Sequence, residues 1–179
     1  LDDERLRIDL IGLGRYRVVR KGQVIIKSGA MASSFFVILS GLVRYYFLMP
    51  HGKEWNKAFF HEGHLVGSLS SFLLDKPCSY AVEALENSFL AELPMAIFTD
   101  QTSRNEQLTT LFNDYVQKIM LRNEEREALL LTCNSEERYR WVLENQAWLE
   151  RRIPQFHLAS YLGMEPASLS RIKRSIELS

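Results

Sequence analysis

The sequence predicts an α+β protein with an N-terminal antiparallel β jelly roll, one long helix and a C-terminal helical domain. Three observations predict it. Short apolar runs separated by glycines fill the first 93 residues, a stretch without Gly or Pro follows from 105 to 131, and basic residues gather after 150. A chain of 179 residues can bury one full hydrophobic core and a smaller second one.

The jelly roll is expected between Arg15 and Leu93. Six apolar, β-branched and aromatic runs predict its strands: Tyr16–Val19, Val24–Ile26, Phe35–Leu39, Leu42–Phe47, Lys57–Phe60 and Tyr80–Val82. Glycines at 22, 29, 41, 52 and 63 separate the runs, with gaps of 7, 12, 11 and 11 residues that are typical of an all-β sandwich or barrel. Gly22 and Gly52 can adopt positive φ, which favours hairpins at those two points.

One long helix is expected from Asn105 to Leu131. Its apolar residues recur at three- and four-residue spacing and form a stripe: Leu108, Leu111, Phe112, Tyr115 and Ile119. Charged residues flank the stripe, as in a helix that packs along a narrow seam, so we expect these residues to pair two subunits. The alternative is a helix that lies back on its own barrel.

Another helix is expected to begin after Asn134. Asn134 and Glu137 have the spacing of a capping box, in which each side chain accepts a hydrogen bond from an otherwise unpaired amide. One apolar face runs as far as Ala147, and Ile153-Pro154 ends the pattern.

Residues 155–174 have the form of a helix-turn-helix. Ala159 is small enough for a close crossing of two helices, Gly163 can reverse the chain in the left-handed conformation, and Pro166 suits the first turn of a second helix. Two ordinary surface helices with basic residues by chance are the alternative, which the joint placement of these residues disfavours. Residues 151–179 carry five basic and two acidic residues, a net charge of +3.

The second helix of this motif predicts binding of double-stranded DNA. Leu169, Ile172 and Ile176 fall on one side and anchor the helix. The expected DNA-binding residues are Pro166, Ala167, Ser168, Ser170, Arg171, Lys173, Arg174, Arg151 and Arg152. Arg171 is expected to read bases, because a guanidinium can bond two acceptors on guanine, and the other cations to contact phosphates. One such helix covers few bases, so a homodimer is expected.

The chain resembles the Crp/Fnr family of bacterial transcription regulators over nearly its whole length. The similarity is carried by Lys21-Gly-Gln-Val-Ile-Ile26, Phe35-Phe-Val-Ile-Leu-Ser-Gly-Leu-Val-Arg44, Gly63-His-Leu-Val-Gly-Ser68 and the helix-turn-helix. The resemblance implies a cyclic-nucleotide-binding-like sensor domain over 1–102, a dimerisation helix over 103–133 and a DNA-binding domain over 134–179. It also implies transcription regulation, with RNA polymerase as a partner.

Two departures from the family pattern bear on the ligand and the DNA. Relatives that bind cyclic nucleotides carry Gly-Glu for the ribose and an Arg-Ser or Arg-Thr pair for the phosphate, whereas this chain has Gly67-Ser68 and Cys78-Ser79. Without the guanidinium we expect no cyclic AMP binding, which leaves a degenerate pocket and an unidentified small-molecule effector. The usual β-hairpin wing is expected to be truncated or absent, so the second helix carries most of the DNA contact.

Other classes of protein are disfavoured. No apolar run is long enough to span a membrane, no secretion signal is visible, and two cysteines are too few for a disulfide framework, so we expect a cytoplasmic protein. No catalytic pair, cofactor motif or metal site is visible, and we expect no enzyme. His61 and His64 raise a cupin-like metal enzyme as an alternative, but they bracket a glycine turn without a third ligand.

Three further interpretations stay open or minor. A ligand-binding or interaction module without DNA binding remains a second alternative. Cys78, near the expected pocket, is either a packed thiol or a sensor of oxidants. The turn histidines and also His51 and His157 are expected at the surface.

Overall fold

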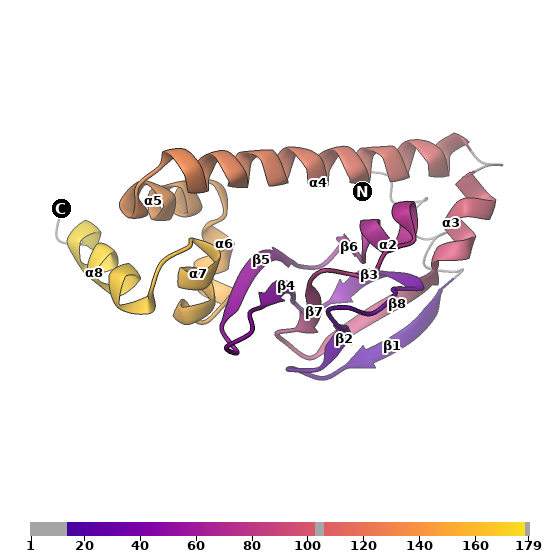
Figure 1. The fold of residues 1–179 in the computed structure, drawn as a ribbon, viewed down its shortest axis with the longest axis horizontal. Helices are drawn as coiled ribbons and strands as arrows, with labels where there is room; N and C mark the ends of the chain where they lie inside the picture. Colours follow the sequence, from indigo (N-terminus) through magenta and orange to yellow (C-terminus); the bar gives the residue numbers. More distant parts are fainter. Residues whose placement is uncertain (1–13, 103–105, 178–179) are drawn as a thin grey trace.

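The computed structural model describes the backbone of residues 14–102 and 106–177, with side chains described for 14–99, 109–110 and 112–176. A β-roll occupies one end of the elongated molecule and the C-terminal helices occupy the other (Figure 1). The long helix α4 runs along one side of both and connects them (Figure 1).

The β-roll consists of two four-stranded antiparallel sheets. The first has the order β1 (Arg15–Val19), β8 (Ser88–Pro94), β3 (Ser34–Ser40) and β6 (Leu65–Val66), and the second has the order β2 (Val24–Ile26), β7 (Ala81–Ala84), β4 (Val43–Leu48) and β5 (Glu54–Phe60). The expected jelly roll is therefore confirmed. Gly52, with φ of 78°, lies in the hairpin between β4 and β5, as expected. Gly22 also has positive φ, of 80°, but the hairpin expected there does not form, because β1 and β2 belong to different sheets.

Some elements of the roll are absent from the sequence prediction. Strand β8 pairs with both β1 and β3, yet it lies outside the six expected runs. Its Ala91 and Glu92 dilute the apolar pattern, and its two neighbours across the sheet define it as a strand. Helices α2 (Leu69–Leu74) and α3 (Met95–Thr102) have six and eight residues, which is too short for a helical period to stand out.

Helix α4 (Glu106–Thr132) confirms the expected long helix, but its stripe faces the β-roll. The rings of Phe112 and Tyr115 lie 6.1 and 6.4 Å from the ring of Phe35, which is fully buried in the roll. Phe112 and Tyr115 therefore cover the aromatic cluster around Phe35, as in the alternative of a helix that lies back on its own barrel. The pairing of two subunits through these residues stays a prediction. Ile119 is half-buried on the same side, and the side chains of Leu108 and Leu111 lie outside the described residues.

The C-terminal domain contains α5 (Ser135–Asn145), α6 (Ala147–Arg152), α7 (Gln155–Tyr161) and α8 (Pro166–Glu177). The capping box is confirmed: the Asn134 side chain accepts from the amide of Glu137, whose carboxylate accepts from the Asn134 amide at 2.7 Å. The single helix expected as far as Ala147 is divided, because Gln146 has non-helical φ and ψ of −141° and 40°. The core of this domain is formed by Tyr139, Val142, Leu149, Ile153, Leu158, Ala159, Leu162 and Leu169.

Candidate nucleic-acid interface and sensor cradle

Helices α7 and α8 form the expected helix-turn-helix. Gly163 has φ of 68° at the turn between them, and a Cβ there would lie 3.3 Å from both Arg138 and Leu130. Ala159 on α7 and Leu169 on α8 are fully buried between the helices and the rest of the domain. Pro166 is the first residue of α8, where its missing amide hydrogen costs nothing.

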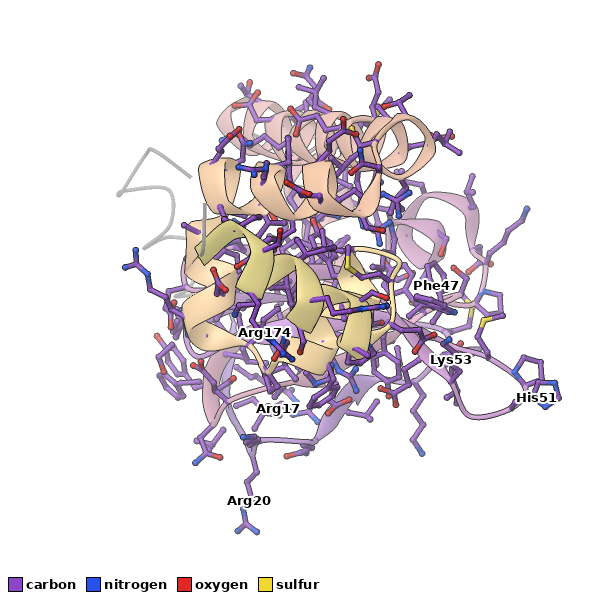
Figure 2. The ribbon with its side chains drawn as sticks, turned by 90° about the vertical axis from the view of Figure 1, so that its left-hand side faces the viewer. Arg17, Arg20, Phe47, His51, Lys53 and Arg174 are labelled. Carbon is purple, nitrogen blue, oxygen red and sulfur yellow. The ribbon has the colours of Figure 1, made fainter. Side chains whose placement is uncertain are left out.

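The outer face of α8 carries small and basic side chains. Ala167, Arg171 and Arg174 are exposed. Ser168 and Ser170 are half-buried: Ser168 accepts a 3.3 Å hydrogen bond from Arg171, and Ser170 accepts one of 2.9 Å from Gln155. In Figure 2, α8 lies at the end of the molecule that faces the viewer, with Arg174 labelled. The two exposed guanidiniums form no ion pair with a carboxylate among the described side chains.

Two other cations expected to contact DNA, Arg152 and Lys173, form ion pairs with glutamates of this chain. Arg152 forms ion pairs of 2.8 Å with Glu62 and 2.7 Å with Glu86, which join α6 to the β-roll. The hydrogen bonds that Arg152 donates hold the pKa of Glu62 at about 2, and the bonds that Glu86 and Glu62 accept from Arg152 raise the pKa of its guanidinium. Lys173 is paired with Glu150 of α6. Arg152 therefore joins two domains in this structure, and these ion pairs disfavour the expected phosphate contact.

Arg151 stands apart from its neighbour. Its side chain is exposed, and it forms no ion pair within the described part of the chain. The two adjacent arginines at the end of α6 thus have opposite surroundings.

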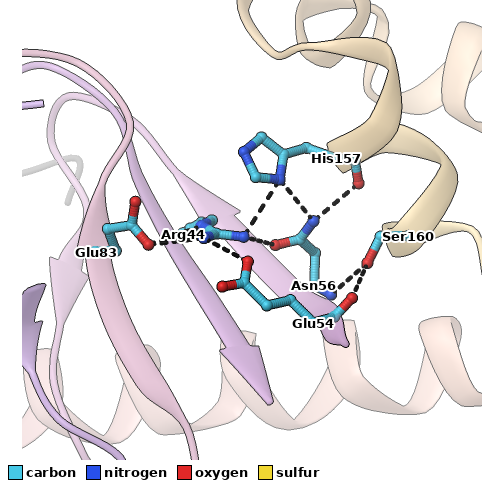
Figure 3. Close-up of polar contacts among 6 residues, drawn as sticks. All are labelled: Arg44, Glu54, Asn56, Glu83, His157 and Ser160. Atoms are coloured by element: carbon cyan, nitrogen blue, oxygen red, sulfur yellow. Dashed lines mark hydrogen bonds and ion pairs between the residues drawn. The ribbon is translucent and has the colours of Figure 1, made fainter. Parts of the chain in front are cut away.

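A buried polar network joins α7 to the β-roll (Figure 3). Its centre is Arg44 of β4, which is 4% exposed and lies 2.7 Å from carboxylate oxygens of both Glu54 and Glu83. Arg44 also donates to Asn56 at 3.1 Å and approaches Nδ1 of His157 at 3.2 Å. His157 is thus buried, and the expectation of a surface residue is wrong because α7 packs on β5.

The network requires a neutral His157. Both Arg44 and Asn56 present N–H donors to its Nδ1, each at 3.2 Å, so this nitrogen must accept rather than donate. Burial, followed by the charge of Arg44, lowers the pKa of His157 to about 4. Neighbouring contacts add backbone hydrogen bonds: the Ser160 hydroxyl accepts from the Asn56 amide and donates to the Glu54 carbonyl, both at 2.9 Å.

Two arginines fix α4 to the helix-turn-helix through main-chain carbonyls. Arg126 donates to the carbonyls of Asn56 and Tyr161, at 3.0 and 2.9 Å. Arg138 donates to the carbonyls of Leu130 and Leu162, at 2.8 and 3.1 Å. These two arginines and Arg44 are not among the site residues expected from the sequence. For Arg44 the sequence does contain a signal, because a charged residue inside the apolar run Leu42–Phe47 needs a buried partner.

The pocket expected to be degenerate, at the positions that hold a cyclic nucleotide in relatives that bind one, is occupied by the protein's own contacts. The main chain of Gly67 is hydrogen-bonded to two phenols: Tyr45 both donates to its carbonyl and accepts from its amide, and Tyr80 donates to its carbonyl at 2.9 Å. Ser68 is fully buried and caps α2 through the amide of Ser71. A side chain at position 67 would collide with Phe35, so only glycine fits there.

The other two residues of the pocket are Cys78 and Ser79, which take the place of the Arg-Ser or Arg-Thr pair. Cys78 is fully buried, and its thiol donates to the carbonyl of Tyr80 at 3.1 Å. Ser79 is exposed, and its carbonyl accepts from Ser28. A thiol without access to solvent is a packed residue, which disfavours the interpretation of Cys78 as a sensor of oxidants.

His61 and His64 contact each other, with ring centroids 4.4 Å apart. Within residues 14–102 and 106–177, however, no group of three or more His, Cys, Asp or Glu side chains is placed to hold a metal ion. None of the helices in the same part of the chain is long and apolar enough to cross a membrane.

Comparison with protein families places the first half of the chain. Residues 16–105 match the model of the cyclic nucleotide-binding domain. The chain is 29% identical to the fumarate and nitrate reduction regulatory protein of Vibrio cholerae and 28% identical to the anaerobic regulatory protein of Pasteurella multocida. Each match covers 88% of this chain, but the chain spans only 67% and 61% of those two relatives.

Solved structures match the whole arrangement. FixK2 from Bradyrhizobium japonicum superposes with a TM-score of 0.80 at 18% identity, covering 92% of this chain and 85% of that chain. The c-di-GMP-responsive regulator CLP from Xanthomonas campestris gives a TM-score of 0.81 at 14% identity, covering 98% and 92%. The chain belongs to the cyclic nucleotide-binding domain family and has the β-roll, long helix and C-terminal helices of the Crp/Fnr regulators.

Proposed function

We propose that this protein is a sequence-specific, double-stranded DNA-binding transcription regulator of the Crp/Fnr type. The observation that carries the proposal is the outer face of α8, where Arg171 and Arg174 are exposed without a carboxylate partner among the described side chains, while Leu169 anchors the opposite side. Small residues beside the two arginines allow close approach to a groove, and the guanidiniums can reach bases or phosphates. The names of the relatives as regulatory proteins agree with this function.

The proposed domains have the bounds expected from the sequence. They are a sensor domain over 1–102, a dimerisation helix over 103–133 and a DNA-binding domain over 134–179. Helix α3 ends at Thr102, α4 ends at Thr132 and α5 begins at Ser135, which agrees with these bounds. The proposed DNA-contacting set is now centred on Arg171 and Arg174, with Arg151 as an additional cation and without Arg152.

The proposed homodimer uses a different face of α4 from the one expected. Met120, Leu121 and Leu131 are 64%, 60% and 77% exposed on the side of α4 away from the roll. Large apolar side chains that are exposed on one helix suit contact with a second copy. A two-fold pair would place two α8 helices on one duplex, about 34 Å apart. RNA polymerase and a cytoplasmic site of action complete the proposal.

The cupin-like enzyme is not favoured, because the relatives are regulators and no third ligand accompanies His61 and His64 among the described residues. A binding experiment distinguishes our proposal from the other alternative, a ligand-binding or interaction module that does not bind DNA. Bound fragments are selected from a random duplex pool, and affinity for the enriched sequence is then measured at several salt concentrations. We expect an enriched, two-fold-symmetric sequence and an affinity that falls steeply as salt rises. A pool that stays random and unbound at low salt would contradict the proposal.

A further inference from the structure

A cavity of about 430 Å³ lies between the β-roll, α4 and the junction of α5 with α6. Its volume is within the range of about 300–1,000 Å³ found for small-molecule sites. The wall is largely aromatic and apolar, with the main contributions from Phe60, Phe98, Phe112, Tyr115, Ile119 and Trp148. Ring edges and faces on several sides suit a flat aromatic body, which can adopt edge-to-face contacts.

Two buried donors on this wall have no acceptor. The hydroxyl of Tyr115 and Nε of Arg122 are both buried and form no hydrogen bond in the described structure. They are seven residues apart on α4, so they lie on the same face of the helix. Arg122 also lies over the ring of Phe60, 4.7 Å from its centroid, on the cavity wall. Buried donors without partners are rare, because each costs free energy unless an acceptor is present.

The charge near Arg122 is not compensated by carboxylates. Lys57, Arg122 and Arg126 lie close enough that burial and the two guanidiniums lower the pKa of Lys57 to about 8. None of the three forms an ion pair with a described Asp or Glu. Asp114 and Lys118 also line the cavity, but both are exposed and carry opposite charges. An anion bound at Arg122 would therefore reduce an existing repulsion.

This cavity is separate from the nucleotide cradle. Gly67, Ser68, Cys78 and Ser79 are not among its lining residues, and the polar groups of Gly67 and Ser68 are already bonded internally. A ligand here would instead contact the end of β5, the middle of α4 and the α5–α6 junction. These elements belong to all three parts of the chain.

We propose that the cavity binds a small aromatic carboxylate, with its ring among Phe112, Tyr115 and Trp148 and its carboxylate at Arg122. As a binding site the cavity does not depend on DNA binding. Its role as the effector site rests on the proposed function.

The test uses 2-naphthoate as the probe and 2-naphthalenemethanol as its neutral analogue, both titrated calorimetrically into the full chain. We expect the acid to bind one site per chain, at least about tenfold more tightly than the alcohol, because a charge-assisted hydrogen bond is made only by the acid. Binding should also change the fluorescence of Trp148, and a Trp148→Phe variant should lose that change. Equal affinities for the two probes, or no binding to the folded protein, would overturn the proposal.

Variants localise the site. Arg122→Gln should reduce affinity for the acid about tenfold or more and leave affinity for the alcohol unchanged. Arg140→Gln is the matched control, because Arg140 is exposed on α5 and pairs only with Glu136 within the described chain. If Arg122→Gln does not fold, Ile119→Trp places a larger ring on the cavity wall without changing charge and should weaken binding of both probes about tenfold or more. Naphthoate affinity that is unchanged by Ile119→Trp in a folded protein would overturn the proposal.

Measurements with DNA separate this inference from the proposed function. Naphthoate binding without any duplex binding would contradict the proposed function and leave the ligand site intact. Sequence-specific duplex binding without naphthoate binding would support the proposed function and overturn the ligand site.

Discussion

The helix-turn-helix has two polar surfaces with opposite surroundings. On α7, His157 and Ser160 enter a network in which Arg44 and Asn56 find partners from the roll. On α8, Arg171 and Arg174 project outward with no carboxylate partner among the described side chains. The first surface holds two domains together, and the second remains available for a partner outside the chain.

The role of a basic residue in this domain depends on its surroundings and not only on its type. Arg151 and Arg152 are adjacent in sequence, yet one is exposed and the other is bound to Glu62 and Glu86. A count of positive charges in the last segment includes both. Only the positions of acidic residues that lie about 65 and 90 positions earlier in the chain distinguish them.

Removal of Arg44, the centre of the network that α7 joins, should have the largest effect on stability. We expect Arg44→Ala to lower the free energy of unfolding by about 3–5 kcal/mol, because Glu83 and Glu54 lose their cation in a half-buried site. Urea unfolding of the variant and of the parent protein measures the change. Arg140→Ala, which breaks an exposed pair with Glu136, should change stability by less than about 0.5 kcal/mol. A loss at Arg44 no larger than this control would show that the network contributes little.

The same surface predicts a pH dependence. With a folded-state pKa of about 4 against an ordinary 6.5, His157 stays neutral in the folded protein while it binds a proton in the unfolded one. Stability from this residue is complete above pH 6.5 and declines as the pH falls toward 4, by on the order of 3 kcal/mol.

This dependence is measured as unfolding free energies between pH 7 and about 5, a range in which most carboxylates stay ionised. His157→Gln, which keeps a hydrogen-bond acceptor without a titrating ring, should flatten the profile. A variant profile as steep as that of the parent protein would assign the acid sensitivity to other groups.

Substitution on the α8 surface should change DNA binding and not stability. We expect Arg171→Ala to weaken binding to the selected duplex by about 1–3 kcal/mol and to relax preference at one base position. Competition binding against single-base variants of the duplex measures both effects. Since the Arg171 side chain is exposed, the unfolding midpoint of the Arg171→Ala variant should match that of the parent protein. Unchanged affinity would remove Arg171 from the reading face.

The smallest expected effect compares two arginines directly. Arg174→Gln should reduce the slope of log affinity against log salt by about 1, because one phosphate contact is lost. Arg152→Gln should leave that slope unchanged and lower stability instead, since its guanidinium is bound to Glu62 and Glu86. Equal changes of slope for the two variants would show that Arg152 leaves the roll to contact DNA.

Local signals in the sequence determined much of the fold. The capping box at Asn134, the turn at Gly163 and the start of α8 at Pro166 were predictable because each depends on residues within a few positions. The same is true of the glycine-punctuated β-roll, in which turn residues and apolar runs follow one another closely. The residues of the α8 face also follow from the helical period once the helix is placed.

Tertiary structure decided which face each element presents to the rest of the molecule. The stripe with Phe112 and Tyr115 covers the roll, because Phe35 and its aromatic neighbours lie there. His157 is buried, because β5 places Asn56 opposite α7 across about 100 residues of chain. Periodicity identifies an apolar or polar face without identifying its partner, and the partner is chosen by contacts between residues far apart in sequence.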